Sequence, residues 1–197
     1  MRAWLAALWA VAAFGLGGCQ PAPPAGDFQA TDITGAPFGR DFRLTDHNGQ
    51  TRTLADFRGK VVAVFFGYTH CPDVCPTTLS DFAAALKQLG PDAQRVQVIF
   101  VTVDPARDTP EMLRAFVPAF DPSFLGMYTD AASLAALAGE FKVVYQKSSV
   151  KAPDDYLIDH SAGTYVYDTH GRLRLLMPYG SSPEAIAADL RVLLSAN

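Results

Sequence analysis

The chain has 197 residues, of which 49% are hydrophobic and 18% are charged, and its formal net charge is -4. This length is enough for one domain of ordinary size and too short for two large ones. The composition is typical of a folded globular protein and excludes a disordered chain. The negative net charge gives no electrostatic footprint for nucleic acid, so we expect no nucleic-acid partner.

The first 18 residues have the pattern of a signal peptide. Arg2 gives a positive start, and an apolar run over residues 3–16 follows. This run is shorter than the roughly 20 residues of a membrane-spanning helix, and it fits a secretory signal. Residues 16–19, Leu-Gly-Gly-Cys, resemble a bacterial lipobox, in which Cys19 is lipidated and becomes the first mature residue. The alternative is an uncleaved anchor helix, and both interpretations predict a membrane-anchored domain on the periplasmic side.

Residues 19–37 predict a tether between the lipidated cysteine and the domain. The segment contains four prolines among alanine, glycine and aspartate. This composition is typical of a flexible or semi-extended linker. We therefore expect the folded domain over residues 38–197.

Strand-like and helix-like segments alternate along this domain. An Asn-Gly pair at residues 48–49 predicts a first hairpin, and continuous apolar runs at residues 61–66 and 96–103 are typical of buried parallel strands. The other expected elements are helices at 78–89, from Thr109, at 131–141 and from Ser182 to about 195, a strand at 124–128, a loop before 164, and a hairpin of strands 164–167 and 173–177. This order predicts an α/β fold with a central mixed sheet flanked by helices and an N-terminal β-hairpin.

Cys71 and Cys75 lie between the first long strand and the next helix, which makes the predicted fold thioredoxin-like. A helix start favours the thiolate form of a cysteine. Two converging thiolates suit soft metal ions. Structural zinc sites and iron–sulfur clusters usually take four protein ligands, so copper completed by an imidazole fits a single pair best. A structural disulfide is the alternative, although so short a loop removes little unfolded-state entropy.

The four histidines differ in their suitability as a third ligand. His47 and His170 adjoin predicted turns, and we expect them to be solvated. His70 adjoins Cys71, but adjacent side chains tend to point apart, so we expect a surface or supporting position. His160 precedes the strand at 164–167, and in a thioredoxin-like sheet that strand entrance lies beside the dithiol turn.

The surroundings of His160 favour metal binding over disulfide exchange. A thiol reductase of this fold keeps a cis-proline at the strand entrance, and this chain has no proline between Pro153 and Pro178. Asp73 and Asp159 are candidate carboxylates for orienting the ligands. Turn and helix-start chemistry is the simpler interpretation of both.

Three separated blocks of sequence resemble the signature of the Sco/SenC family of copper chaperones for cytochrome c oxidase. The blocks are FGYTHCPDVCPTTL at residues 66–79, VDPARDTP at 103–110 and DYLIDHSAGTY at 155–165. The resemblance implies a thioredoxin-like fold, with copper ligands at Cys71, Cys75 and His160 and a Cys71–Cys75 disulfide in the oxidised form. Many members carry a transmembrane helix where this chain has a lipobox, which puts the mode of membrane attachment in doubt.

The resemblance also implies a function. It predicts a membrane-tethered copper-binding assembly factor, not an enzyme in the turnover sense, that carries Cu(I) or Cu(II). The expected partners are cytochrome c oxidase subunit II, whose dinuclear copper site it would load or reduce, and another periplasmic copper chaperone or thiol reductant. Two alternatives stay open: a thiol–disulfide oxidoreductase in which Cys71 attacks and Cys75 resolves, and a redox or copper sensor.

Overall fold

The computed structural model of the chain describes residues 28–196. The expected signal peptide, Cys19 and the tether up to residue 27 lie outside the described residues. Within residues 28–196, no helix combines the length and the hydropathy that a membrane span requires.

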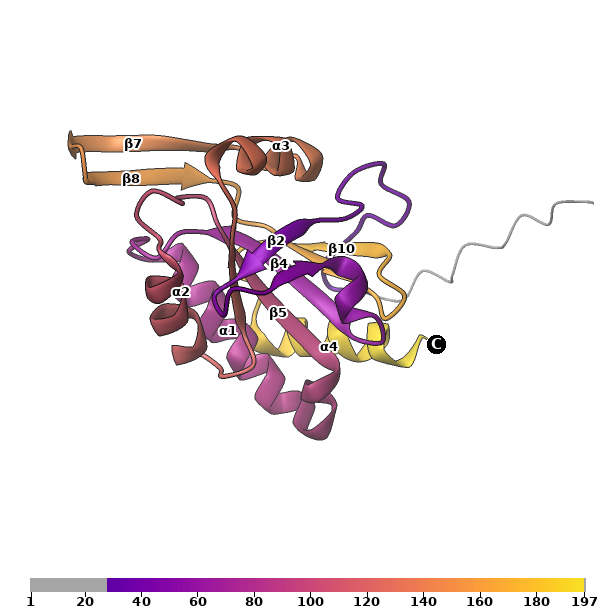
Figure 1. Ribbon diagram of the computed structural model, residues 1–197. Helices are drawn as coiled ribbons and strands as arrows, with labels where there is room; N and C mark the ends of the chain where they lie inside the picture. The colour runs from indigo at the N-terminus through magenta and orange to yellow at the C-terminus, as the bar shows by residue number, and fades with distance from the viewer. Residues whose placement is uncertain (1–27, 197) are drawn as a thin grey trace, which may run out of the picture.

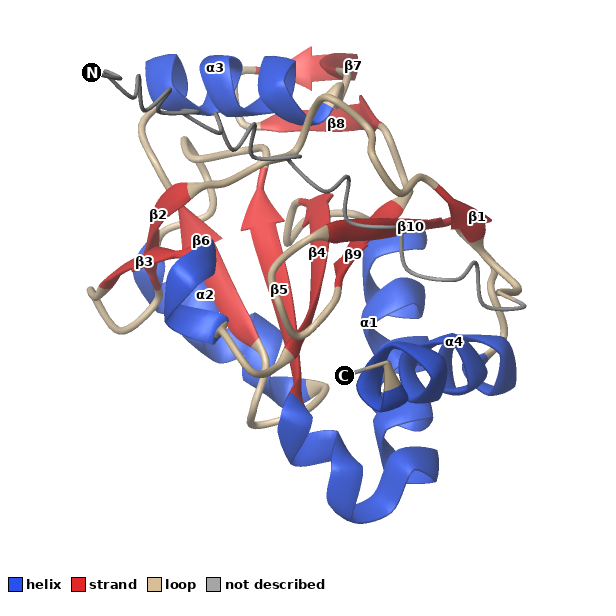
Figure 2. Ribbon diagram, turned by 90° about the vertical axis from the view of Figure 1, so that its right-hand side faces the viewer, coloured by secondary structure: helices blue, strands red, loops and turns tan. Residues whose placement is uncertain are grey.

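Eight strands form one mixed central sheet in the order β1-β10-β9-β4-β5-β6-β2-β3. The strands are β1 Thr31–Asp32, β2 Arg43–Asp46, β3 Thr51–Thr53, β4 Val61–Gly67, β5 Val96–Thr102, β6 Leu125–Tyr128, β9 Thr164–Tyr167 and β10 Leu173–Met177. β4, β5 and β6 run parallel, whereas β9 runs antiparallel to β4 (Figure 2). Every residue of β4 and β5 is buried, which explains their continuous apolar runs.

Helices cover the sheet and complete the predicted thioredoxin-like α/β fold. They are α1 Val74–Leu89, α2 Pro110–Phe116, α3 Ala131–Phe141 and α4 Pro183–Ser195, with short 3-10 helices at Leu54–Phe57, Gly90–Arg95 and Val117–Ala119. α1 and α4 pack side by side below the sheet in Figure 1. The expected starts of three helices are confirmed, because the side chains of Thr109, Asp130 and Ser182 accept hydrogen bonds from first-turn N–H groups.

α1 begins at Val74, four residues before the predicted start, so Cys75 lies in its first turn. Pro76 did not prevent this early start. The N–H groups of the first turn have no intrahelical partner, and a proline is therefore tolerated there. The earlier start matters for the site, because it fixes the Cys75 side chain on a regular helix.

The loop expected before residue 164 is wrong. Tyr145–Ala152 forms β7 and Asp155–His160 forms β8, and the two pair as a separate two-stranded antiparallel sheet. Figure 1 shows this hairpin beside α3, away from the central sheet. β7 carries a polar sequence with mostly exposed side chains, so it lacks the alternation that predicts a strand.

The folded part of the chain begins ahead of the boundary expected at residue 38. β1 pairs with β10, with Thr31 opposite Leu176. The N–H groups of Gln29 and Ala30 donate to the buried carboxylate of Asp189 on α4, at 2.7 and 2.8 Å. The end of the expected tether is therefore fastened to the domain by backbone hydrogen bonds.

Candidate metal centre

The two cysteines lie where β4 passes into α1. Both are free thiols; Cys75 is fully buried, and Cys71 is half-buried in the loop before the helix. The backbone N–H of Cys75 points at the Cys71 sulfur, with 3.5 Å between N and Sγ. The loop before α1 thus brings the Cys71 sulfur to the N-terminus of the helix, beside the Cys75 sulfur.

His160 is the last residue of β8, and its ring faces the cysteines. Its Nε2 lies 3.5 Å from the Sγ of Cys75. Its Nδ1 lies 3.0 Å from the carbonyl oxygen of Ser161. A carbonyl only accepts, so Nδ1 carries the ring proton, and in the neutral ring Nε2 is left with a free lone pair.

Buried aromatic rings fix the orientation of the His160 ring. The rings of Phe65 and Tyr68 meet it edge-on, with centroids at 6.0 and 5.9 Å. The two sulfurs and the imidazole nitrogen all lie within 4.8 Å of one another. Two thiolates and one imidazole form a donor set that suits a soft metal ion. The predicted trio of Cys71, Cys75 and His160 is thus brought together in space.

The two thiols differ in acidity. The Cys75 thiol donates a hydrogen bond to the Cys71 sulfur, and this bond is the main reason that the pKa of Cys71 falls from 9.0 to about 3. The backbone N–H groups of Asp73 and Cys75 add to the effect, and burial opposes it. The pKa of Cys75 is raised, because its thiol is the donor to Cys71 and because the side chain is buried. These pKa directions favour a half-buried thiolate at Cys71 and a buried thiol at Cys75 when no metal is bound.

This difference predicts the pH dependence of alkylation. In the reduced, metal-free chain, we expect the rate of Cys71 modification by iodoacetamide to change little between about pH 8 and about pH 5, whereas an ordinary thiol loses about tenfold per pH unit. A lowered pKa keeps the thiolate present until the pH falls to the new pKa, so the rate stays high over this window. Mass spectrometry of the peptide that contains Cys71 measures the rate.

The Cys75→Ala variant is the control for this experiment. It removes the hydrogen-bond donor, so the pKa of Cys71 should rise toward its ordinary value and the usual pH dependence should return. If the wild-type rate falls tenfold per pH unit below pH 8, the thiol pair does not stabilise a Cys71 thiolate.

The other predicted site residues do not join the cluster. The exposed carboxylate of Asp73 accepts from the Thr77 hydroxyl at 3.3 Å. The exposed carboxylate of Asp159 accepts from the Ser148 hydroxyl at 3.0 Å, within the β7–β8 hairpin. In the described part of the chain, neither carboxylate bonds to a side chain of the trio. Asp73 contributes only through its backbone N–H.

Two of the three remaining histidines lie as expected, and one does not. His70 and His170 are exposed. His47, expected to be solvated, is buried, and its Nδ1 accepts from the Gly126 N–H at 3.0 Å. The expectation for His47 is wrong because β2 pairs with β6, and this pairing folds the turn over Gly126. Sequence reasoning also missed the roles of Tyr68 and Ser161, since neither residue type is a usual ligand.

Comparison with known proteins agrees with this geometry. The SCO1/SenC family model matches residues 30–195. The mitochondrial protein SCO2 homolog of Bos taurus is 37% identical over 153 residues, which are 77% of this chain and 58% of the bovine protein. This chain therefore spans less than two thirds of that relative's length.

Two solved structures show a similar fold. Bradyrhizobium japonicum ScoI with copper bound is 40% identical and has a TM-score of 0.73, with 79% of this chain and 99% of that chain covered. Apo Sco1 from Thermus thermophilus is 44% identical and has a TM-score of 0.75, with 84% and 96% covered. Because the family model covers nearly the whole described domain, the chain belongs to the SCO1/SenC family.

Proposed function

We propose that this protein binds copper through Cys71, Cys75 and His160 and serves in the assembly of cytochrome c oxidase. The observation that carries the proposal is the convergence of two sulfurs and one imidazole nitrogen within 4.8 Å. The similar Bradyrhizobium structure, which holds copper, supports the choice of metal. The sulfur donors favour Cu(I), and the imidazole also suits Cu(II).

The redox state of the cysteines controls loading in this proposal. Copper needs both sulfurs as thiolates, and a metal ion at the site would draw the second proton from Cys75. Oxidation of the Cys71 thiolate and the Cys75 thiol to a disulfide removes two electrons and one proton and leaves no thiolate for the metal. Cys71 lies in the loop just before α1 and Cys75 in its first turn, with the two sulfurs close together, so closing the disulfide needs only a local adjustment.

Transfer of copper would proceed by exchange of ligands with a partner. Cys71 is the accessible sulfur, so it is the first ligand that an incoming thiolate reaches. We propose subunit II of cytochrome c oxidase as the recipient. We also propose an extracytoplasmic, lipid-anchored location, which the N-terminal sequence pattern supports. Another copper chaperone or a thiol reductant would supply the site or restore its reduced form.

The test is copper titration of the reduced full-length chain with Cu(I) and with Cu(II). We expect a single copper ion per chain, with sulfur-to-copper charge-transfer absorption in the Cu(II) form. His160→Ala removes the nitrogen ligand and keeps both thiolates, so affinity should fall by at least about 10-fold and the absorption bands should shift. His170→Ala is the matched control, because that histidine is exposed and outside the trio.

The result that contradicts the three-ligand site is specific. If His160→Ala binds copper as tightly as the wild type, with an unchanged spectrum, His160 is not a ligand. If the wild type itself binds no copper when reduced, the whole proposal fails.

The acidity of Cys71 favours a second candidate function, reduction of a partner disulfide. A half-buried thiolate beside a buried thiol is the arrangement of an attacking and a resolving cysteine. Cys71 would attack the partner disulfide, and Cys75 would then release the partner's second thiol. Fast exchange with a model disulfide that His160→Ala leaves unchanged would favour this candidate over copper binding.

A further inference from the structure

The β7–β8 hairpin, which ends in His160, is held to the domain by few groups. Its sheet pairs with no strand of the central sheet. In the described part of the chain, and apart from the bond of His160 to the adjacent Ser161, residues 145–160 hydrogen-bond to the rest of the domain through Tyr68, Cys75, Asp104 and Arg107. The Cys75 contact belongs to the metal centre itself. The other three hold the body of the hairpin, whereas Phe65, Tyr68 and Ser161 contact the His160 ring itself.

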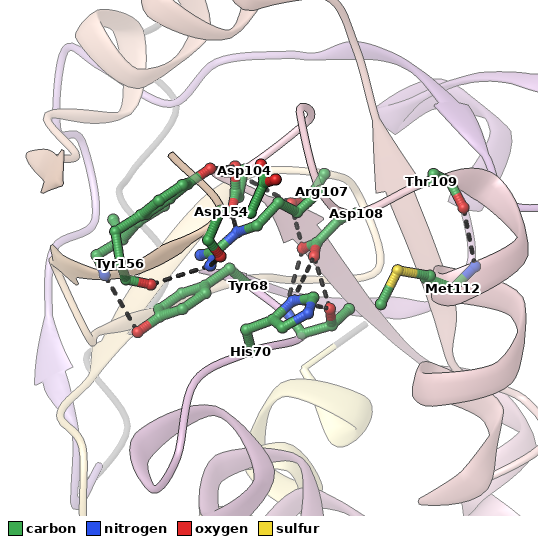
Figure 3. Close-up of polar contacts among 12 residues, drawn as sticks. Tyr68, His70, Asp104, Arg107, Asp108, Thr109, Met112, Asp154 and Tyr156 are labelled. Carbon is green, nitrogen blue, oxygen red and sulfur yellow. Dashed lines mark hydrogen bonds and ion pairs between the residues drawn. The ribbon is translucent and has the colours of Figure 1, made fainter. Parts of the chain in front are cut away.

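Arg107 makes the most extensive of these contacts. Its Nη1 donates to the carbonyl oxygens of Asp154 and Tyr156, at 3.2 and 3.0 Å (Figure 3). Its guanidinium carbon lies 3.6 Å from the centroid of the Tyr156 ring. Its Nε donates to Asp104 at 2.5 Å, and the side chain is 10% exposed. A planar guanidinium can stack and donate in several directions at once, which a lysine ammonium cannot do.

The contacts of Arg107 reach His160 along one face of β8. Tyr156, Ile158 and His160 alternate with exposed residues, so the three share the face that points to the domain. The Tyr156 hydroxyl donates to Asp104 at 2.8 Å. The Ile158 N–H donates to the Tyr68 hydroxyl at 3.2 Å, and the Tyr68 ring contacts His160. A shift of Tyr156 would therefore move His160 with it.

The loop over residues 104–108, which contains Arg107, also bonds to the segment just before the cysteines. Asp108 is 1% exposed. Its carboxylate accepts from the Thr69 N–H at 3.0 Å and from the hydroxyls of Thr69 and Thr102, each at 2.6 Å. Thr69 precedes Cys71 by two residues. The loop over residues 104–108 is thus bonded to both parts of the site.

We propose that Arg107 is a positioning residue of the metal centre. It holds β8 against the loop over residues 104–108 and thereby sets the distance from His160 to the two sulfurs. The proposal rests on the proposed function, in which His160 is a copper ligand. Its structural part, that Arg107 fixes the hairpin, is measured without copper.

The first experiment measures amide hydrogen exchange in the reduced, metal-free full-length chain. Arg107→Lys keeps a positive charge beside Asp104 but loses the stacking on Tyr156 and the bonds to the two carbonyls. We expect faster exchange at Ile158 and along β8, with β4 and β5 unchanged. Arg114→Lys is the matched control, because Arg114 also donates to a backbone carbonyl, that of His47, and does not touch the hairpin.

The second experiment is a double-mutant cycle on copper affinity. Arg107→Lys should weaken Cu(I) binding on the order of 10–100-fold, the usual effect of losing a group that orients a ligand. In the His160→Ala background the same substitution should have little further effect, because its action passes through His160. A general loss of stability would weaken both backgrounds equally.

Three outcomes overturn the proposal. They are wild-type exchange along β8 in Arg107→Lys, exchange that rises equally in the central sheet, and losses of copper affinity that add in the double variant. If His160→Ala alone leaves copper affinity unchanged, the proposed function fails as well. The exchange data then still report separately on whether Arg107 holds the hairpin.

Discussion

Replacing Cys75 by serine is expected to abolish tight Cu(I) binding by the reduced full-length chain. The hydroxyl is a hard and weakly acidic ligand, whereas Cu(I) selects soft thiolates. Only Cys71 and His160 would remain. The loss should exceed the 100-fold or so that follows from removing an orienting group alone. Competition with a chromophoric Cu(I) chelator measures the affinity of the variant.

Cys19→Ser is the matched control for this prediction. It removes the third cysteine, which we expect to carry the lipid anchor and not the metal, so copper affinity should equal that of the wild type while membrane attachment is lost. Cys71→Ser should behave as Cys75→Ser does. If Cys75→Ser retains wild-type affinity for Cu(I), the buried sulfur is not a ligand and the helix turn holds no metal.

Most of the fold could be predicted from local sequence, because apolar runs and helix caps are signals that lie within the elements they predict. The apolar runs that became β4 and β5 are buried on both faces, so their whole composition reflects the core. Helix starts were predicted where a capping side chain precedes the first turn, as at Thr109 and Ser182. Such signals do not depend on what else the chain packs against.

The elements that sequence reasoning missed depend on tertiary contacts. β7 is polar and exposed, and its pairing with β8 stabilises it more than its own propensity does. β1 has two residues, and it exists because it pairs with β10 and because Asp189 binds the preceding N–H groups. Asp189 is 160 positions from Gln29, so the sequence around Gln29 carries no signal of this contact.

The same division applies to the site. The two cysteines are only four positions apart in sequence, and their position between a strand and a helix predicts thiolate chemistry. His160 is 85 positions from Cys75 and was found from its place before a strand and from the family resemblance. The loop that contains Arg107 was recognised only as part of a block that resembles the family signature. Its contacts to β8 became visible only once the hairpin was known to exist.

Gly67→Ala is expected to disturb both the metal centre and the stability of the domain. Gly67 ends β4. A Cβ at this position would lie 2.8 Å from the Cys75 sulfur and 2.8 Å from the Phe100 ring, closer than real Cβ contacts come. Phe100 is fully buried and cannot move aside easily, so the Cys75 sulfur must shift. Copper affinity should therefore fall.

The stability effect has a matched control in the same chain. Overpacking a core typically costs about 1–3 kcal/mol, which corresponds to a decrease in Tm of roughly 2–12 °C for a domain of this size. Gly139→Ala makes the same chemical change on α3, where an added Cβ meets nothing within 4 Å, and should stabilise the helix by about 0.5–1 kcal/mol. Thermal unfolding and copper titration of both variants distinguish the cases. If Gly67→Ala has the Tm and the copper affinity of the wild type, there is free space around the Cys75 sulfur. Close packing then does not fix the position of this sulfur relative to His160.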